Sequence, residues 1–216
     1  MSDAATDGRS ESTVPRTIVQ VGDARVVRAL AGRSGLPQAV WGMLTLIAAE
    51  TMLLGSFIAS YYYFWAHSPD WPPDGIAPPH VAVPLVLAAC LAATSVPIQM
   101  ASRAARSGRA DAALRLVVVA GVVQAGYLAF EVHSLAGDLN SFTPQTDAYG
   151  SIYYVLLGAA HAHVFVGLLL SLWLVTKLAG GLTTYRANAA QAIAWYWQAV
   201  IVLSLVITGV ILSATL

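Results

Sequence analysis

Charged residues are scarce in this sequence. Only 10% of its 216 residues are Asp, Glu, Lys or Arg, whereas a soluble globular domain carries roughly 25%. The deficit is concentrated in long stretches that hold no charged residue at all, namely residues 75–102, 116–130, 148–176 and 187–216. This composition excludes an ordinary soluble fold and indicates a chain that lies largely within a membrane.

Cysteine and net charge are also nearly absent. The one cysteine, Cys90, cannot form a disulfide within the chain or supply a metal site built from a cysteine pair. The formal net charge is zero, so the composition gives no support for nucleic acid as a partner. These two absences remove classes of function and leave the apolar segments as the informative feature.

The sequence is rich in apolar segments of membrane-spanning length. A helix needs about 20 residues to cross the hydrocarbon core, and five segments reach this length, the third when Arg115 and Glu131 near its ends are included. We therefore predict an all-α integral membrane bundle of five transmembrane helices, with approximate bounds 39–65, 80–102, 112–135, 151–177 and 190–213. Five spans do not divide into equal repeats, so the usual signature of a secondary transporter is missing.

The distribution of basic residues predicts the orientation of the bundle. Residues 1–36 hold five arginines and residues 103–109 hold three, whereas the loops at 66–79 and 136–150 hold aspartates and no Lys or Arg. Because basic residues gather on the cytoplasmic side, we expect the N-terminus in the cytoplasm and the C-terminus outside. We expect residues 1–36 to be a polar, disordered cytoplasmic tail and residues 37–216 to form the transmembrane domain.

A single carboxyl group lies near the middle of the first predicted span. Glu50 is the only charged residue between Arg33 and Asp70, and a carboxyl group at mid-membrane costs at least about 2.5–3.5 kcal/mol on insertion scales. With a rise of about 1.5 Å per residue, Glu50, His163 and Gln198 fall at similar depths, which allows a buried polar cluster. Glu50 then has either a functional role or the role of an interhelical hydrogen bond, and we expect it to be protonated.

The histidines raise the question of a haem or metal site. His161 and His163 are two residues apart, so a regular helix directs them about 200° from each other. Glu131 and His133 lie near the end of the third predicted span, away from His163. A metal or haem site therefore needs residues from distant helices, and hydrogen-bonded histidines in the bundle are the alternative.

Four segments of the chain carry distinctive motifs, namely WGMLTLIAAETMLLGSFIASYYYFW (41–65), FEVHSL (130–135), AYGSIYYVLLGAAHAHVFVGLLLSLWLV (148–175) and GLTTYRANAAQAIAWYWQAV (181–200). In this order and at this spacing they resemble subunit III of haem–copper oxidases. In that family a membrane glutamate follows Gly-Met and a short apolar run, Glu and His stand two apart at the end of a later helix, and Tyr-Gly-Ser precedes a His-rich turn. The resemblance covers residues 40 to 216 and corresponds to a five-helix form of the subunit.

The resemblance also implies site residues. Glu50 corresponds to a buried glutamate of the family, near bound phospholipid and a suggested oxygen route. Glu131 and His133 carry over from the second matching segment, and the residues that carry over from the last two are Tyr149, Gly150, Ser151, Gly158, His163, Val164, Gly167 and Trp197. The missing side chains of Gly158 and Gly167 also suit close helix packing.

Two departures from the family pattern concern polar residues. Ala160 stands where the family usually has His, and His161 stands where it usually has Gly. In the last helix, Gln198 and Ile201 stand where the family usually has His and Asp. Because the chain has fewer polar residues than the family pattern, an alternative function is that of an accessory subunit of a nitric oxide reductase. A second alternative, based on the histidines, is a small b-type cytochrome.

The resemblance implies a non-catalytic subunit III of a respiratory haem–copper terminal oxidase. Haem and copper are then expected in the catalytic subunit I, with subunit II as a further partner and with no cofactor or metal in this chain. A structural phospholipid and other membrane lipids are expected to bind the chain itself. The family supports oxygen access, proton uptake and stability of its catalytic neighbour, and we expect a multi-pass location in a bacterial-type cytoplasmic membrane.

Overall fold

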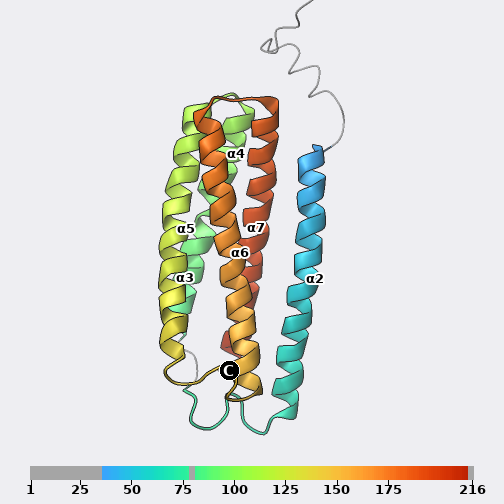
Figure 1. Ribbon diagram of the computed structural model, residues 1–216, viewed down its shortest axis with the longest axis vertical. Helices are drawn as coiled ribbons and strands as arrows, with labels where there is room; N and C mark the ends of the chain where they lie inside the picture. Colours follow the sequence, from blue (N-terminus) through green and yellow to red (C-terminus); the bar gives the residue numbers. More distant parts are fainter. Residues whose placement is uncertain (1–35, 78–80, 214–216) are drawn as a thin grey trace, which may run out of the picture. The chain divides into compact units, whose positions relative to one another are not determined.

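The computed structural model describes residues 36–77 and 81–213, and its regular elements are helices (Figure 1). They are α2 (Gln38–His67), α3 (Ala82–Ala93), α4 (Ser95–Arg106), α5 (Ala110–Asp138), α6 (Ala148–Ala179) and α7 (Thr184–Leu212). Five spans are long and apolar enough to cross a membrane, with α3 and α4 together forming one of them, so the chain is a multi-pass membrane protein. The predicted all-α class and the five spans are confirmed, while the predicted tail lies outside the described residues except for Leu36.

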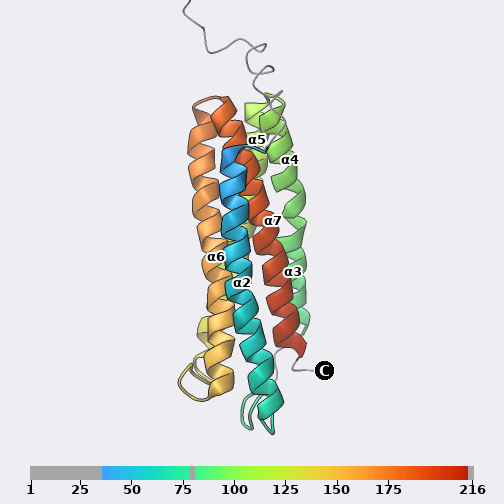
Figure 2. The same cartoon turned by 90° about the vertical axis from the view of Figure 1, so that its right-hand side faces the viewer.

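Four spans form a bundle, and α2 lies against one side of it. α5 and α7 each pack against both α4 and α6, so these helices surround a common core. α2 packs against α6 and α7, and Figure 2 shows it lying across these two helices. Of the 30 residues of α2, Val40, Leu54 and Tyr61 are the buried ones. Most of the apolar surface of α2 is therefore uncovered.

The second span is broken in its middle. We predicted one uninterrupted helix over 80–102, but α3 ends at Ala93, α4 begins at Ser95, and the span continues to Arg106. Pro97 is the physical reason, because proline has no N–H to donate and its ring clashes with the carbonyl of the residue four positions earlier. The hydroxyl of Thr94, at the break, donates to the carbonyl oxygen of Leu91 at 2.6 Å.

The two ends of the bundle differ in charge. We call one end the basic end, because it holds Arg103, Arg106, Arg109, Lys177 and Arg186. We call the other the acidic end, because it holds Asp70, Asp74, Asp138 and Asp147. The chain topology places all the residues of each set at one end of the bundle. Which end faces the cytoplasm stays a prediction.

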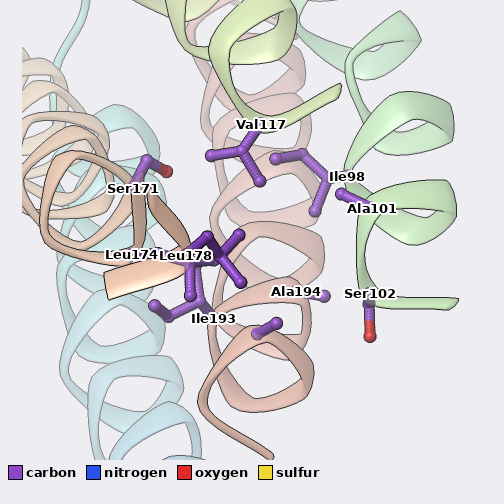
Figure 3. Close-up of a pocket in the computed structure, with 10 residues that line it drawn as sticks. Ile98, Ala101, Ser102, Val117, Ser171, Leu174, Leu178, Ile193 and Ala194 are labelled. Atoms are coloured by element: carbon purple, nitrogen blue, oxygen red, sulfur yellow. The ribbon is translucent and has the colours of Figure 1, made fainter. Parts of the chain in front are cut away.

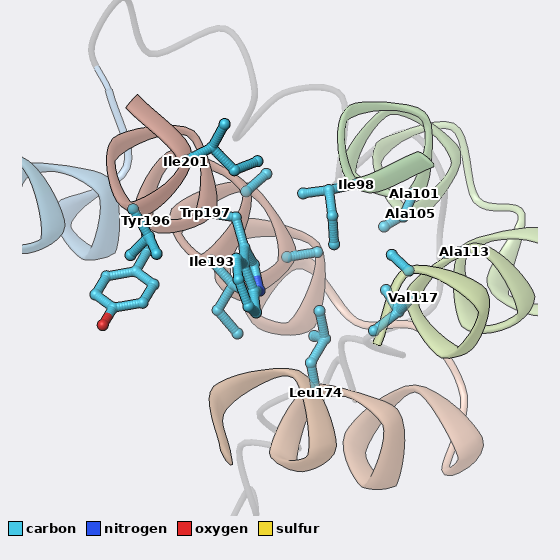
Figure 4. Packing of buried hydrophobic residues seen from close by; sticks show 14 of the residues in the cluster. Ile98, Ala101, Ala105, Ala113, Val117, Leu174, Ile193, Tyr196, Trp197 and Ile201 are labelled. Carbon is cyan, nitrogen blue, oxygen red and sulfur yellow. The ribbon is translucent and has the colours of Figure 1, made fainter. Parts of the chain in front are cut away.

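A dense core fills the half of the bundle near the basic end. Trp197 of α7 is fully buried there and reaches between Ile98, Val117 and Leu174 from α4, α5 and α6 (Figure 4). Alanines line the facing surfaces, and their small side chains let helices approach closely. The buried alanines of this core are Ala101, Ala104, Ala105, Ala113, Ala120, Ala190 and Ala194.

The void left in this core is very small. It measures about 10 Å³ and is bordered by Ile98, Val117, Leu174 and Ile193, which face one another in Figure 3. That volume is at the lower limit for one water molecule. The helices around this void are therefore closely packed.

Candidate functional site

Two glutamate–histidine pairs lie on opposite sides of α6. His163 pairs with Glu50 of α2, and His161 pairs with Glu131 of α5. The two histidines are two residues apart on one unbroken helix, so their side chains point about 200° away from each other around the helix axis. The prediction that they cannot point at one site is therefore confirmed, and each carries its own acidic partner.

The Glu50–His163 pair joins α2 to the bundle. Nδ1 of His163 lies 2.6 Å from the carbonyl oxygen of Ala159, and because a carbonyl only accepts, Nδ1 carries a proton. Nε2 of His163 lies 2.9 Å from Oε2 of Glu50. Two lone pairs would face each other there if neither atom carried a proton, so the pair holds one proton between them. The expectation that Glu50 carries it stays a prediction.

A tyrosine of α7 contacts the backbone of α6 at the same site. The hydroxyl of Tyr196 donates to the backbone carbonyl of His163 at 2.9 Å. Tyr196 is buried in the same core as Trp197, and its ring points away from α4 and α5 (Figure 4). Three helices, α2, α6 and α7, therefore meet at His163. The side chain of Glu50 is still 30% exposed, so the pair lies at the edge of the bundle.

The Glu131–His161 pair lies deeper in the bundle. Nε2 of His161 is 3.3 Å from Oε2 of Glu131, and the His161 side chain is only 7% exposed. Nδ1 of His161 is buried without a hydrogen-bond partner among the described residues. A buried polar atom without a partner costs about 1–3 kcal/mol. The pair therefore has hydrogen-bonding capacity that the described part of the chain does not use.

Two of the predicted buried polar residues, one of them from the predicted cluster, lie elsewhere. Gln198 does not join Glu50 and His163, because its Oε1 accepts a hydrogen bond from the hydroxyl of Ser95 at 2.7 Å, on the α4 side of α7. Gln198 lies at the predicted depth. It is two residues from Tyr196, however, so its side chain points to the opposite side of α7 from the side that faces His163. His133 was expected to be buried beside Glu131, and it is exposed on the surface of α5.

The Tyr149-Gly150-Ser151 segment forms the start of α6. Asp147 caps this helix, since its Oδ1 accepts from the backbone N–H of Gly150 at 2.6 Å. Only glycine fits at 150, because a Cβ there would lie 2.5 Å from the carbonyl oxygen of Thr143. The hydroxyl of Ser151 donates to backbone carbonyls of the preceding turn. These residues fix where α6 begins.

Two glycines of α6 differ in what surrounds them. A Cβ at Gly167 would lie 2.7 Å from Cζ2 of Trp197, so this glycine lets α6 and α7 approach closely. Nothing lies within 4 Å of the corresponding position at Gly158. The expectation of close packing holds for Gly167 and is wrong for Gly158. The indole N–H of Trp197 donates to the hydroxyl of Ser171 at 2.9 Å.

A further polar chain at the helix break was not foreseen. Nε2 of Gln124 donates to the hydroxyl oxygen of Thr94 at 3.0 Å, and Gln124 is fully buried. Ser95 follows Thr94 and makes the contact with Gln198 described above. Gln124 could have been identified from the sequence as a polar residue in the middle of a span. Its partner could not, because the position of Thr94 depends on the break between α3 and α4.

The described residues offer no ready metal centre. Within residues 36–77 and 81–213, no three His, Cys, Asp or Glu side chains converge as ion ligands would. Cys90 is exposed on α3. The chemistry that the two pairs support is the holding of a proton between a carboxyl group and an imidazole.

Known sequences share this pattern. Residues 16–212 match the family model described as cytochrome c oxidase subunit III. Proteins named cytochrome c oxidase subunit 3 from Formosania lacustris and Struthio camelus are 31% and 32% identical to the chain over 168 residues, which is 73% of the chain. A protein of the same name from Scyliorhinus canicula is 30% identical. The aligned part is 62% of each of these relatives, so the chain matches about three fifths of their length.

Proposed function

This chain belongs to the cytochrome c oxidase subunit III family, and on this premise we propose that it is the non-catalytic subunit III of a respiratory haem–copper terminal oxidase. The observation that carries the proposal is the Glu50–His163 contact, because it joins two segments that carry the family resemblance. In this proposal haem and copper belong to subunit I, and this chain supports oxygen access, proton uptake and the stability of that neighbour.

The exposed face of α2 supports an assembly with other membrane subunits. Large apolar side chains are exposed along the whole helix, including Trp41 at 59% and Met52 at 78%. In a membrane such a face meets either lipid or another helix. We assign it to contact with subunit I or with a structural phospholipid, and subunit II completes the complex. The Glu50–His163 pair at the edge of α2 then lies near that contact.

The location in the proposal is a bacterial-type cytoplasmic membrane. The basic end of the bundle supports an orientation with that end in the cytoplasm. The N-terminus then lies in the cytoplasm and the C-terminus outside. Attachment of a membrane-impermeant reagent to a cysteine introduced at Asp74 in intact cells tests this, with a cysteine introduced at Arg109 as the control on the opposite side.

Co-purification tests the function directly. The full chain carries an affinity tag at its N-terminus, is extracted in mild detergent, and its partners are identified together with a haem spectrum and oxygen uptake. A larger haem–copper subunit and oxygen consumption are expected. A complex that reduces nitric oxide instead of oxygen, or a chain that emerges alone, contradicts the proposal; haem bound to the isolated chain contradicts the absence of a cofactor.

Glu50 variants test the contact that carries the proposal. Glu50→Gln keeps a donor for Nε2 of His163, so complex yield and turnover lifetime are expected to stay near the wild-type values. Glu50→Ala removes a partly buried hydrogen bond worth about 0.5–1.5 kcal/mol and is expected to lower lipid content, complex yield and turnover lifetime. If Glu50→Ala leaves all three unchanged, the contact has no part in assembly.

A further inference from the structure

A large cavity lies in the half of the bundle near the acidic end. Its volume is about 530 Å³, and it is lined by residues of α3, α5, α6, α7 and the loop before α3. Small-molecule sites in proteins are commonly about 300–1,000 Å³. The cavity is thus large enough for an organic ligand, and it is separate from the Glu50–His163 pair, which does not line it.

The wall of the cavity holds two carboxyl groups and an imidazole. Glu131, Asp138 and His161 line it, and Glu131 and Asp138 are seven residues apart on α5. Seven residues are two helical turns, so both acids lie on one face and about 10 Å apart along the axis. Asp138 accepts a hydrogen bond from the hydroxyl of Tyr153 at 2.7 Å. Glu131 contacts His161, whose other nitrogen has no partner among the described residues.

The charge of the wall selects the kind of ligand. No Lys or Arg is among the residues that line the cavity. An anionic head group would meet two carboxyl groups and no Lys or Arg, with the one imidazole already in contact with Glu131, which is unfavourable in a site of low dielectric constant. A head group that donates hydrogen bonds, and carries no negative charge, would instead meet acceptors at Glu131 and Asp138.

The entrance of the cavity indicates where the ligand comes from. Val83 of α3 and Phe130 of α5 line the cavity and are 47% and 48% exposed, so the cavity is open beside these two helices. Both helices belong to spans long and apolar enough to cross a membrane, so a ligand would enter from the lipid. Leu87, Leu135 and Leu157 line the interior and suit an apolar body.

We propose that this cavity binds a membrane-soluble amphiphile whose head group donates hydrogen bonds to Glu131 and carries no negative charge. His161 is a positioning residue, since it holds the Glu131 carboxyl group from the side. The head group is a hydroxyl or an ammonium, which share this chemistry. The inference rests on the cavity and its lining and does not depend on the proposed role in an oxidase.

The test uses three probes with one alkyl chain and different head groups. Dodecylamine, dodecanol and dodecanoate, each with a diazirine on the chain, are added to the full chain, in the complex it purifies with, in lipid nanodiscs. After photolysis, labelled residues are located by mass spectrometry. Saturable labelling of the residues that line the cavity is expected for the amine, the alcohol or both, and at least about tenfold less labelling for dodecanoate.

Two variants show whether the head group and the cavity are responsible. Glu131→Gln keeps an acceptor and removes the charge, so it is expected to weaken labelling by the amine about tenfold and to leave labelling by the alcohol within about twofold. Glu50→Gln, in the pair outside the cavity, is the matched control and should change neither. Ser204→Leu fills the cavity and is expected to lower labelling by all probes about tenfold, with Ser56→Leu on α2 as its control.

The outcomes separate the two sources and can overturn the inference. Labelling by the amine alone assigns an ammonium head group, and labelling by the alcohol assigns a neutral hydroxyl. Labelling by dodecanoate equal to the others overturns the proposed selectivity. Labelling that does not saturate, or that Ser204→Leu leaves unchanged, shows that no ligand occupies the cavity and overturns the site.

Discussion

The two halves of the bundle are built from the same helices but differ in how they are filled. Near the basic end, alanines let the helices close around Trp197, and the void is about 10 Å³. Near the acidic end, bulkier and polar side chains such as Leu157, His161 and Glu131 face one another around about 530 Å³. In a membrane, helices associate mainly through packing. The first half therefore holds its helices through close packing, whereas the second half combines a buried cluster around Tyr149 and Tyr153 with space for a ligand.

The largest difference between the halves is expected on truncating the residue at the centre of the packed half. Trp197→Ala removes a fully buried indole and its hydrogen bond to Ser171, so the free energy of unfolding should fall by about 3–5 kcal/mol. Unfolding in mixed micelles by SDS measures this. Trp195→Ala, at a side chain that is 45% exposed on the same helix, should change it by less than about 0.5 kcal/mol.

A methyl group added between α6 and α7 should have the next largest effect. Gly167→Ala places a Cβ 2.7 Å from Trp197, and overpacking of this kind costs about 1–3 kcal/mol. Gly158→Ala has open space around it and should stabilise the helix by roughly 0.5–1 kcal/mol. Thermal unfolding of the two variants compares them, and a shift of the same sign in both would contradict the difference in packing.

Two buried serines compare the voids themselves. Ser102 borders the small void and is 3% exposed, while Ser204 borders the large cavity and is 4% exposed. Ser102→Leu should therefore lower the free energy of unfolding by about 1–2 kcal/mol, because the added atoms have no room. Ser204→Leu should leave the free energy of unfolding unchanged or raise it. Equal losses in the two variants would mean that the cavity near the acidic end is not open to a side chain.

The smallest effect is expected where the two halves meet. Thr94→Val keeps the shape of the side chain and removes the acceptor for Gln124, so a loss of about 1 kcal/mol is expected. Thr51→Val on α2 is the control, since the Thr51 hydroxyl donates only to a backbone carbonyl at an exposed position. SDS unfolding of both variants gives the comparison, and a larger loss for Thr51→Val would contradict it.

The sequence predicts depth in the membrane better than it predicts which way a side chain points. Charge-free stretches locate the five spans, and a fixed rise per residue brings Glu50 and His163 to one level. The same counting misplaces Gln198, because the angle around a helix axis is set by how helices pack. The partner of His161 escapes prediction for a similar reason: Glu131 lies on a helix whose contact with α6 only the fold reveals.

The Glu50–His163 contact has a consequence for how the chain is made. The two residues are 113 positions apart, so at about 5–20 residues per second His163 is synthesised roughly 6–23 s after Glu50. Through this interval α2 carries a carboxyl group without its partner. The helices against which α2 packs, α6 and α7, are also the last of the described helices to emerge from the ribosome. Among the described helices, the first to be synthesised is thus the one that must wait longest for its contacts.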